Sequence, residues 1–148
     1  MLLSIGAQLL IGCHFGRPPA HVSGFYLEQV SAAGSEFGFQ DMVAAGFQRA
    51  LVQQGTTGAV PLQVRTLRVE ENPVATALDA QVWEIVLSLE ITHGTEAQDA
   101  ILVQGTGRYT LQAGQSVAGT AARNEAYALL VDRLAVEGVR RLNVMELK

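Results

Sequence analysis

Few side chains in this sequence have the type and spacing that nucleophilic or metal chemistry requires. The 148 residues include one cysteine, Cys13, and three histidines. His14, His21 and His93 have no histidine or cysteine partner at the spacing of zinc ligands. We therefore expect no metal site, and we expect His93 to be a surface residue at the end of a strand.

Two further motifs resemble sites without fitting them. Glu70 and Glu71 form a carboxylate pair, but adjacent residues of a strand point to opposite faces. They are interpreted as a solvated strand end and not as an acid–base pair. The segment Gly105-Thr106-Gly107 lacks the third glycine of a phosphate loop and does not precede a helix. The sequence favours neither an enzyme nor a cofactor-binding protein.

Cys13 ends an apolar run that covers residues 1–12. The tetrapeptide Leu10-Ile11-Gly12-Cys13 resembles the lipobox of bacterial lipoprotein signal peptides, in which the cysteine becomes the lipidated first residue of the mature protein. The run has the length of a signal-peptide apolar region and is too short to span a membrane. No Lys or Arg precedes it, so this signal peptide lacks its usual basic start, as a start codon placed too late or a trimmed N-terminus would explain. The alternative is a buried core thiol.

These features suggest three segments. Residues 1–12 are expected to be the signal peptide, shortened at its start, and residues 13–24 a lipidated tether that includes Pro18 and Pro19. Residues 25–148 are expected to form a single domain, because their number suits one core. Hydrophobic residues make up 49% of the chain and charged residues 16%, which is typical of a globular protein. The net charge of −4 argues against a general nucleic-acid-binding protein.

Hydrophobic periodicity predicts the elements of that domain. Apolar residues alternate from Trp83 to Ile91, the pattern of an antiparallel strand with one buried face. Spacings of three and four residues indicate two helices. We expect strands at residues 25–30, 61–69, 80–93 and 100–111, and helices at 39–54 and 121–142. The predicted fold is α+β: a two-layer sandwich in the order βαβββα, with a mainly antiparallel four-stranded sheet and both helices on one face.

Local signals refine these boundaries. The apolar residues of 61–69 change phase, so we expect a β-bulge near Thr66 that brings Leu67 and Val69 onto the inner face. Residues 70–73 are expected to end that strand. Gly55 suits the left-handed position after the first helix, and Thr120 is expected to be the N-cap of the second.

Glycine and arginine positions add two expectations. Gly105 and Gly107 lie on the inward face of their strand, where another element would approach closely. Arg140 and Arg141 suit the negative end of the second helix, with contact to a phosphorylated ligand as the alternative.

Several of these motifs together resemble the LptE family of lipopolysaccharide-assembly lipoproteins. The tether Gly12-Cys13-His14-Phe15-Gly16-Arg17 is similar to the family's opening, although Pro18 stands where glycine is common. The order of elements over residues 25–142 also agrees. The closing segments are especially similar: Gly105-Thr106-Gly107-Arg108-Tyr109, Ala122-Arg123-Asn124-Glu125-Ala126-Tyr127 and Val139-Arg140-Arg141-Leu142.

The resemblance implies a non-catalytic protein, lipid-anchored through Cys13 with fatty acyl chains such as palmitate. Family members lie inside the outer-membrane β-barrel LptD and contact lipopolysaccharide during its transport. The position after the cysteine holds His14 and not the aspartate of inner-membrane retention, which favours the periplasmic face of the outer membrane. Arg65, Arg68 and Arg108 are the strand-located candidates for contacts with lipopolysaccharide phosphates, with ordinary solvent-facing arginines as the alternative.

Two other classes remain open. The chain could be another envelope lipoprotein, either an auxiliary component of an ABC-type lipid transporter or an activator of a cell-wall synthase. It could also be a cytosolic α+β binding domain with a buried Cys13.

Overall fold

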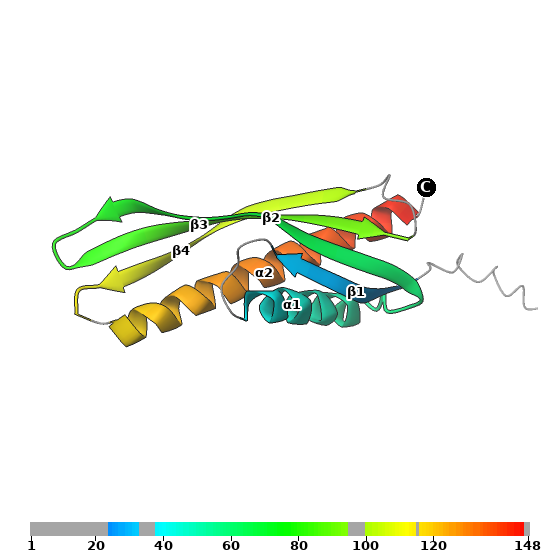
Figure 1. Ribbon diagram of the computed structural model, residues 1–148, viewed down its shortest axis with the longest axis horizontal. Coiled ribbons are helices and arrows are strands. Elements are labelled where there is room, and N and C mark those ends of the chain that lie inside the picture. Colours follow the sequence, from blue (N-terminus) through cyan, green and yellow to red (C-terminus); the bar gives the residue numbers. More distant parts are fainter. Residues whose placement is uncertain (1–23, 33–37, 95–99, 115, 147–148) are drawn as a thin grey trace, which may run out of the picture.

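A four-stranded sheet and two helices make up the fold (Figure 1). The computed structural model describes residues 24–32, 38–94, 100–114 and 116–146. The elements are β1 (Phe25–Ala32), α1 (Phe39–Gln53), β2 (Val60–Thr76), β3 (Ala80–His93), β4 (Ile101–Gln112) and α2 (Ser116–Glu146). The predicted α+β class and the order βαβββα are confirmed.

The strands lie in the order β1-β2-β3-β4, and only the first pair is parallel. A parallel pair needs a crossover connection, and α1 supplies it between β1 and β2. Both helices cover the same face of the sheet, which we call the inner face (Figure 1). The opposite face, which we call the helix-free face, carries no element of the described chain.

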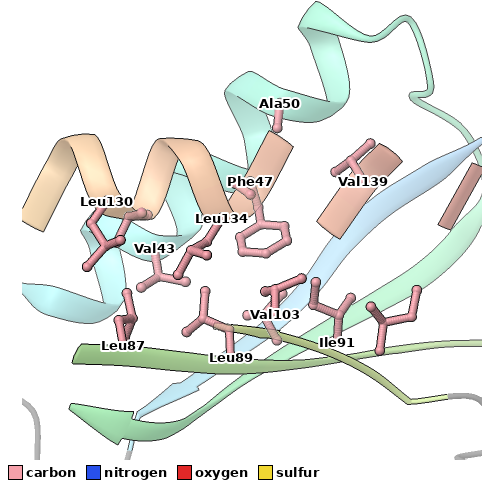
Figure 2. Close-up of a cluster of buried hydrophobic side chains, with 14 of the residues drawn as sticks. Val43, Phe47, Ala50, Leu87, Leu89, Ile91, Val103, Leu130, Leu134 and Val139 are labelled. Carbon is pink, nitrogen blue, oxygen red and sulfur yellow. The ribbon is translucent and has the colours of Figure 1, made fainter. Parts of the chain in front are cut away.

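The core lies between the inner face and the helices. Leu87, Leu89 and Ile91 alternate on β3 and are fully buried, as their spacing predicted. They pack against Phe47 of α1 and Leu134 of α2 (Figure 2). Burial of each such side chain stabilises the fold by about 1.5–3 kcal/mol.

Small residues let the helices approach the sheet and each other. A Cβ atom on Gly105 would lie 3.0 Å from Nη2 of Arg133 and 3.1 Å from Cδ2 of Leu134. A Cβ atom on Gly46 of α1 would lie 2.7 Å from Cγ1 of Val131 on α2. The close approach expected at Gly105 is therefore confirmed, and Gly46 marks the crossing of the two helices.

The β-bulge expected near Thr66 is present, since the register between β2 and β3 shifts between Thr66 and Arg68. It brings Val69 opposite Leu87 on the inner face. Leu67 was wrongly expected there, because the bulge leaves its side chain 47% exposed.

Two expected boundaries are wrong. The strand β2 does not end at Glu70–Pro73 but continues to Thr76. Pro73 is tolerated because β1 pairs only as far as Thr66, so among the described residues no strand lies beside this part of β2 on that side. Thr120 is not an N-cap, because α2 begins at Ser116 and the Thr120 hydroxyl donates to the Ser116 carbonyl within the helix.

The C-terminal end of α2 also differs from expectation. The helix continues to Glu146, so Arg140 and Arg141 do not lie in its last turn. Both arginines instead form ion pairs with Glu137, one turn earlier. Gly55 does adopt the left-handed conformation expected after α1, with a φ of 64°.

Candidate functional site

The three arginines predicted from the sequence lie on the helix-free face. Arg65 faces Glu90 across the β2–β3 pair, and Arg108 faces Glu84 across the β3–β4 pair. Arg68 lies opposite Ser88 on the same face. The sheet register therefore places residues from two different strands on one surface.

Each of these arginines has a carboxylate partner. Nη2 of Arg65 lies 2.8 Å from Oε2 of Glu90, and Nη2 of Arg68 lies 2.6 Å from Oε2 of Glu70. Arg108 donates to Glu84 through Nε and Nη2, at 3.1 and 2.9 Å.

The three arginine side chains remain between 51% and 67% exposed. The helix-free face is thus polar, and each of these three charges is locally compensated. Arg65 also borders a shallow polar depression of about 360 Å³ with Gln29, Gln63 and Thr92.

The interpretation of Glu70 and Glu71 as a solvated strand end is wrong for Glu71. As expected for neighbours on a strand, the two side chains point to opposite faces. Glu70 lies on the helix-free face with Arg68. Glu71 points inward, opposite Ile85, and binds groups from β4 and α2.

The Glu71 carboxylate receives hydrogen bonds from three side chains. The Tyr109 hydroxyl donates to Oε2 and the Tyr127 hydroxyl donates to Oε1, each at 2.6 Å. Nε of Arg123 donates to Oε1 and Oε2 at 2.8 and 3.1 Å, and its Nη2 also donates to Oε1. We call these four residues the Glu71 cluster.

Aromatic packing holds the cluster in place. The Tyr109 ring stacks on Trp83, with the centroids 6.5 Å apart and the planes 13° apart. The Arg123 guanidinium lies 5.2 Å from the centroid of the Tyr127 ring. The ring of Phe39 on α1 also packs edge to face against Tyr127. The cluster therefore ties β2, β4 and α2 together, and Phe39 links it to α1.

The electrostatics of the cluster favour an ionised Glu71. Burial raises the pKa of the carboxyl, but the hydrogen bonds from Arg123, Tyr109 and Tyr127 outweigh it and lower the pKa to about 2. Burial, together with the hydrogen bond to Glu71, raises the pKa of Tyr109 to about 12. At neutral pH Glu71 neither carries a proton to give nor readily accepts one, so it suits a structural tie and not acid–base chemistry.

The remaining candidates are spread over the chain. Cys13, His14 and His21 lie outside the described residues. His93 does end a strand, but it is only partly exposed and its ring packs edge to face on Phe25. Among the described residues, no group of three His, Cys, Asp or Glu side chains could hold a metal ion.

No helix within the described part of the chain combines the length and apolar character that a membrane span needs.

The Glu71 cluster is hard to predict from the sequence, because its members are separated by up to 56 residues. One available signal was Glu71 itself, a charged residue at a position that faces the core. This position can be recognised only if the β-bulge at Thr66 is taken into account, because the bulge changes which residues of the strand face inward.

No family model matches the chain, and no curated protein matches it in sequence. Solved structures do share its fold. Protein XCC0632 from Xanthomonas campestris, of the family DUF330, is 14% identical with a TM-score of 0.56, over 82% of this chain and 84% of that chain. A minor lipoprotein from Acinetobacter baumannii is 14% identical with a TM-score of 0.51, over 83% of this chain and 92% of that chain.

Proposed function

We propose that this protein is an envelope lipoprotein that acts without catalysis as the partner of an outer-membrane β-barrel resembling LptD. Acyl chains on Cys13 would hold it at the periplasmic face of the outer membrane, since stable anchoring takes more than one chain. It would lie within the barrel, support its assembly and contact lipopolysaccharide during transport.

The helix-free face is the observation that carries this proposal. Large outer-membrane barrels have polar interiors, and a polar sheet surface with compensated charges suits such a wall. Exposed ion pairs contribute little to stability, so Arg65 and Arg108 can exchange their carboxylate partners for groups of the barrel at small cost.

The same arginines suit phosphate groups of lipopolysaccharide. A guanidinium presents planar, paired donors that match phosphate oxygens. Arg108 already uses two nitrogens on one carboxylate oxygen of Glu84. A phosphate that displaces Glu84 would meet the same pair of donors, Nε and Nη2 of Arg108.

Two further observations support the proposal. The fold is shared with a minor lipoprotein of Acinetobacter baumannii. In addition, Tyr109, Arg123 and Tyr127, which belong to the motifs that resemble LptE, bind Glu71 in the structure. These motif residues thus have a shared structural role, which is to fix the β2–β3 hairpin over α2.

The test is recovery of the tagged full chain, with its native Cys13, from detergent-solubilised outer membranes. We expect a large heat-modifiable β-barrel to co-purify and mass spectrometry to identify it as LptD-like. The triple variant Arg65→Glu, Arg68→Glu, Arg108→Glu should reduce barrel recovery several-fold. A matched control on the helix side, Arg49→Glu with Arg140→Glu, should leave recovery unchanged.

Recovery of an ABC-type transporter or a cell-wall synthase in place of a barrel would contradict the proposal. The anchor is tested separately by mass spectrometry of the N-terminal peptide, which should carry acyl chains on Cys13. A mature protein that retains Met1 would rule out lipidation.

A further inference from the structure

An open groove of about 590 Å³ lies between the start of β4 and the last turns of α2. The larger apolar side chains exposed along it are Leu102, Val144 and Met145, which are 53%, 55% and 40% exposed. Exposed apolar side chains that gather in one place mark an interaction surface. No residue of the Glu71 cluster lines this groove.

Two arginines border the groove and share one carboxylate. Nη2 of Arg140 lies 2.8 Å from Oε2 of Glu137, and Nε of Arg141 lies 2.8 Å from Oε1 of the same side chain. These three groups together keep one positive charge. Nη1 of Arg141 also donates to the Leu102 carbonyl at 3.1 Å, which holds the cationic border beside the apolar lining. Both arginine side chains remain more than half exposed.

The groove lies at the end of the fold where the chain enters β1. The strand register brings the starts of β1, β2 and β4 and the end of β3 to this end, and α2 ends there as well (Figure 1). Cys13 precedes Phe25 by 12 positions. A fully extended chain of that length spans at most about 43 Å. An anchor on Cys13 would therefore keep this end of the fold, and the groove with it, close to the bilayer.

We infer that this groove docks on the bilayer surface, with anionic phospholipid as its partner. Leu102, Val144 and Met145 would contact the acyl region, and both arginines would donate to lipid phosphates. Apolar side chains beside a cationic border are the combination that binds anionic membrane surfaces. The inference goes beyond the proposed function and rests on it only for the anchor, not for the barrel.

A contact of this size should be weak by itself, because stable membrane binding takes more than one signal. An anchor supplies the second signal, since it raises the effective concentration of the groove at the surface. The anchor and the groove would together hold the domain in one orientation on the membrane. A single point of attachment does not fix an orientation.

Site-specific fluorescence on vesicles tests the inference. The full chain carries Cys13→Ser, and an N-terminal histidine tag holds it on a nickel-chelating lipid in place of acyl chains. An environment-sensitive dye is attached to Val144→Cys. On vesicles of phosphatidylcholine and phosphatidylglycerol, its emission should shift to the blue and be quenched by lipids brominated on their acyl chains. The same dye on Leu78→Cys, at the turn between β2 and β3, should keep the emission that it has in water.

Charge reversal tests the role of the two arginines. Arg140→Glu with Arg141→Glu should reduce the quenching at Val144→Cys at least several-fold, and so should vesicles without phosphatidylglycerol. The matched control, Arg68→Glu with Arg108→Glu, makes the same change in net charge on the helix-free face. It should leave the quenching unchanged.

A second variant keeps the arginines and removes apolar surface from the groove. Leu102→Ser with Met145→Ser should also reduce the quenching at Val144→Cys several-fold. Both side chains are exposed, so their replacement should leave the fold intact. Circular dichroism checks each variant, and the apolar variant decides the question if the charge reversal does not fold.

A dye on Val144→Cys that keeps its emission in water on anionic vesicles would overturn the inference. So would equal quenching at Val144→Cys and Leu78→Cys, or quenching that neither groove variant reduces. The tag replaces the acyl anchor and no barrel is present, so the result does not depend on the proposed function. Barrel recovery from detergent takes place without a bilayer, so Arg140→Glu should not affect it.

Discussion

The Arg123 guanidinium of α2 and the Glu71 carboxylate of β2 meet although 52 positions separate them in the chain. Their side chains are only 25% and 19% exposed, in contrast to the arginine pairs of the helix-free face. The contact fixes the outer part of the β2–β3 hairpin to the N-terminal half of α2. Outside the apolar core, loss of this contact should lower the free energy of unfolding the most.

Replacement of Glu71 by glutamine should lower the free energy of unfolding by about 2–4 kcal/mol, because the charge-assisted hydrogen bonds that Glu71 accepts from Arg123 and Tyr127 would be weakened. Urea unfolding at pH 7 measures the change. The neighbouring variant Glu70→Gln is the matched control and should unfold close to the parent, since its pair with Arg68 is exposed. Equal losses in the two variants would show that the Glu71 cluster is not the stabilising tie.

The Glu71 contribution should depend on acid pH. Its pKa falls from 4.5 to about 2 on folding, so the stabilisation is complete above about pH 4.5 and is lost as the pH falls towards 2. The full effect is on the order of 3 kcal/mol. The difference in unfolding free energy between the parent and Glu71→Gln should therefore shrink between pH 5 and pH 2. A difference that stays constant over this range would contradict the assigned ionisation.

The β4 edge of the sheet, where two arginines of α2 donate to backbone carbonyls, predicts an aggregation phenotype. The double variant Arg133→Ala with Arg141→Ala frees the carbonyls of Thr106 and Leu102. We expect light scattering on mild heating to begin at a lower temperature, because an uncovered edge accepts other strands. The control is Arg140→Ala, whose side chain pairs with Glu137. Similar scattering from both variants would mean that the capping bonds do not protect the edge.

The crossing of the helices should not tolerate a larger residue at Gly46. In Gly46→Ala the new methyl group would meet Cγ1 of Val131 at 2.7 Å. Overpacking of this kind costs about 1–3 kcal/mol and should outweigh the gain of about 1 kcal/mol from the better helix propensity of alanine. Thermal unfolding measures the balance, and a raised melting temperature would show that the helices move apart at little cost.

Much of the fold was predictable because periodicity depends on which face of an element is buried. The alternation from Trp83 to Ile91 and the spacing of Val43 and Phe47 identify β3 and α1 without further information. The ends of elements were harder. Pro73 normally ends a strand, and it is tolerated inside β2 because the described part of the chain pairs β1 with β2 only up to Thr66.

The candidate site was predictable only in part. The three arginines could be placed on strands from the sequence, but that they share one face is seen only from the register of the sheet. The carboxylate partners of Arg65 and Arg108 depend on which residues face each other across β2, β3 and β4, which a single sequence does not reveal. Glu71 was misread because its neighbour Glu70 made the pair look uniformly solvated.

The parallel pairing of β1 with β2 also gives the molecule a direction. Phe25, where β1 begins, lies beside Val60 at the start of β2, and α2 ends at the same end of the molecule (Figure 1). The turn between β2 and β3 lies at the opposite end. With 17 residues in β2 and a rise of about 3.3 Å per residue, that turn lies roughly 55 Å away. An anchor on Cys13 would join the fold at the Phe25 end, so the turn between β2 and β3 would be the part of the described chain that lies farthest along the sheet from the anchored end.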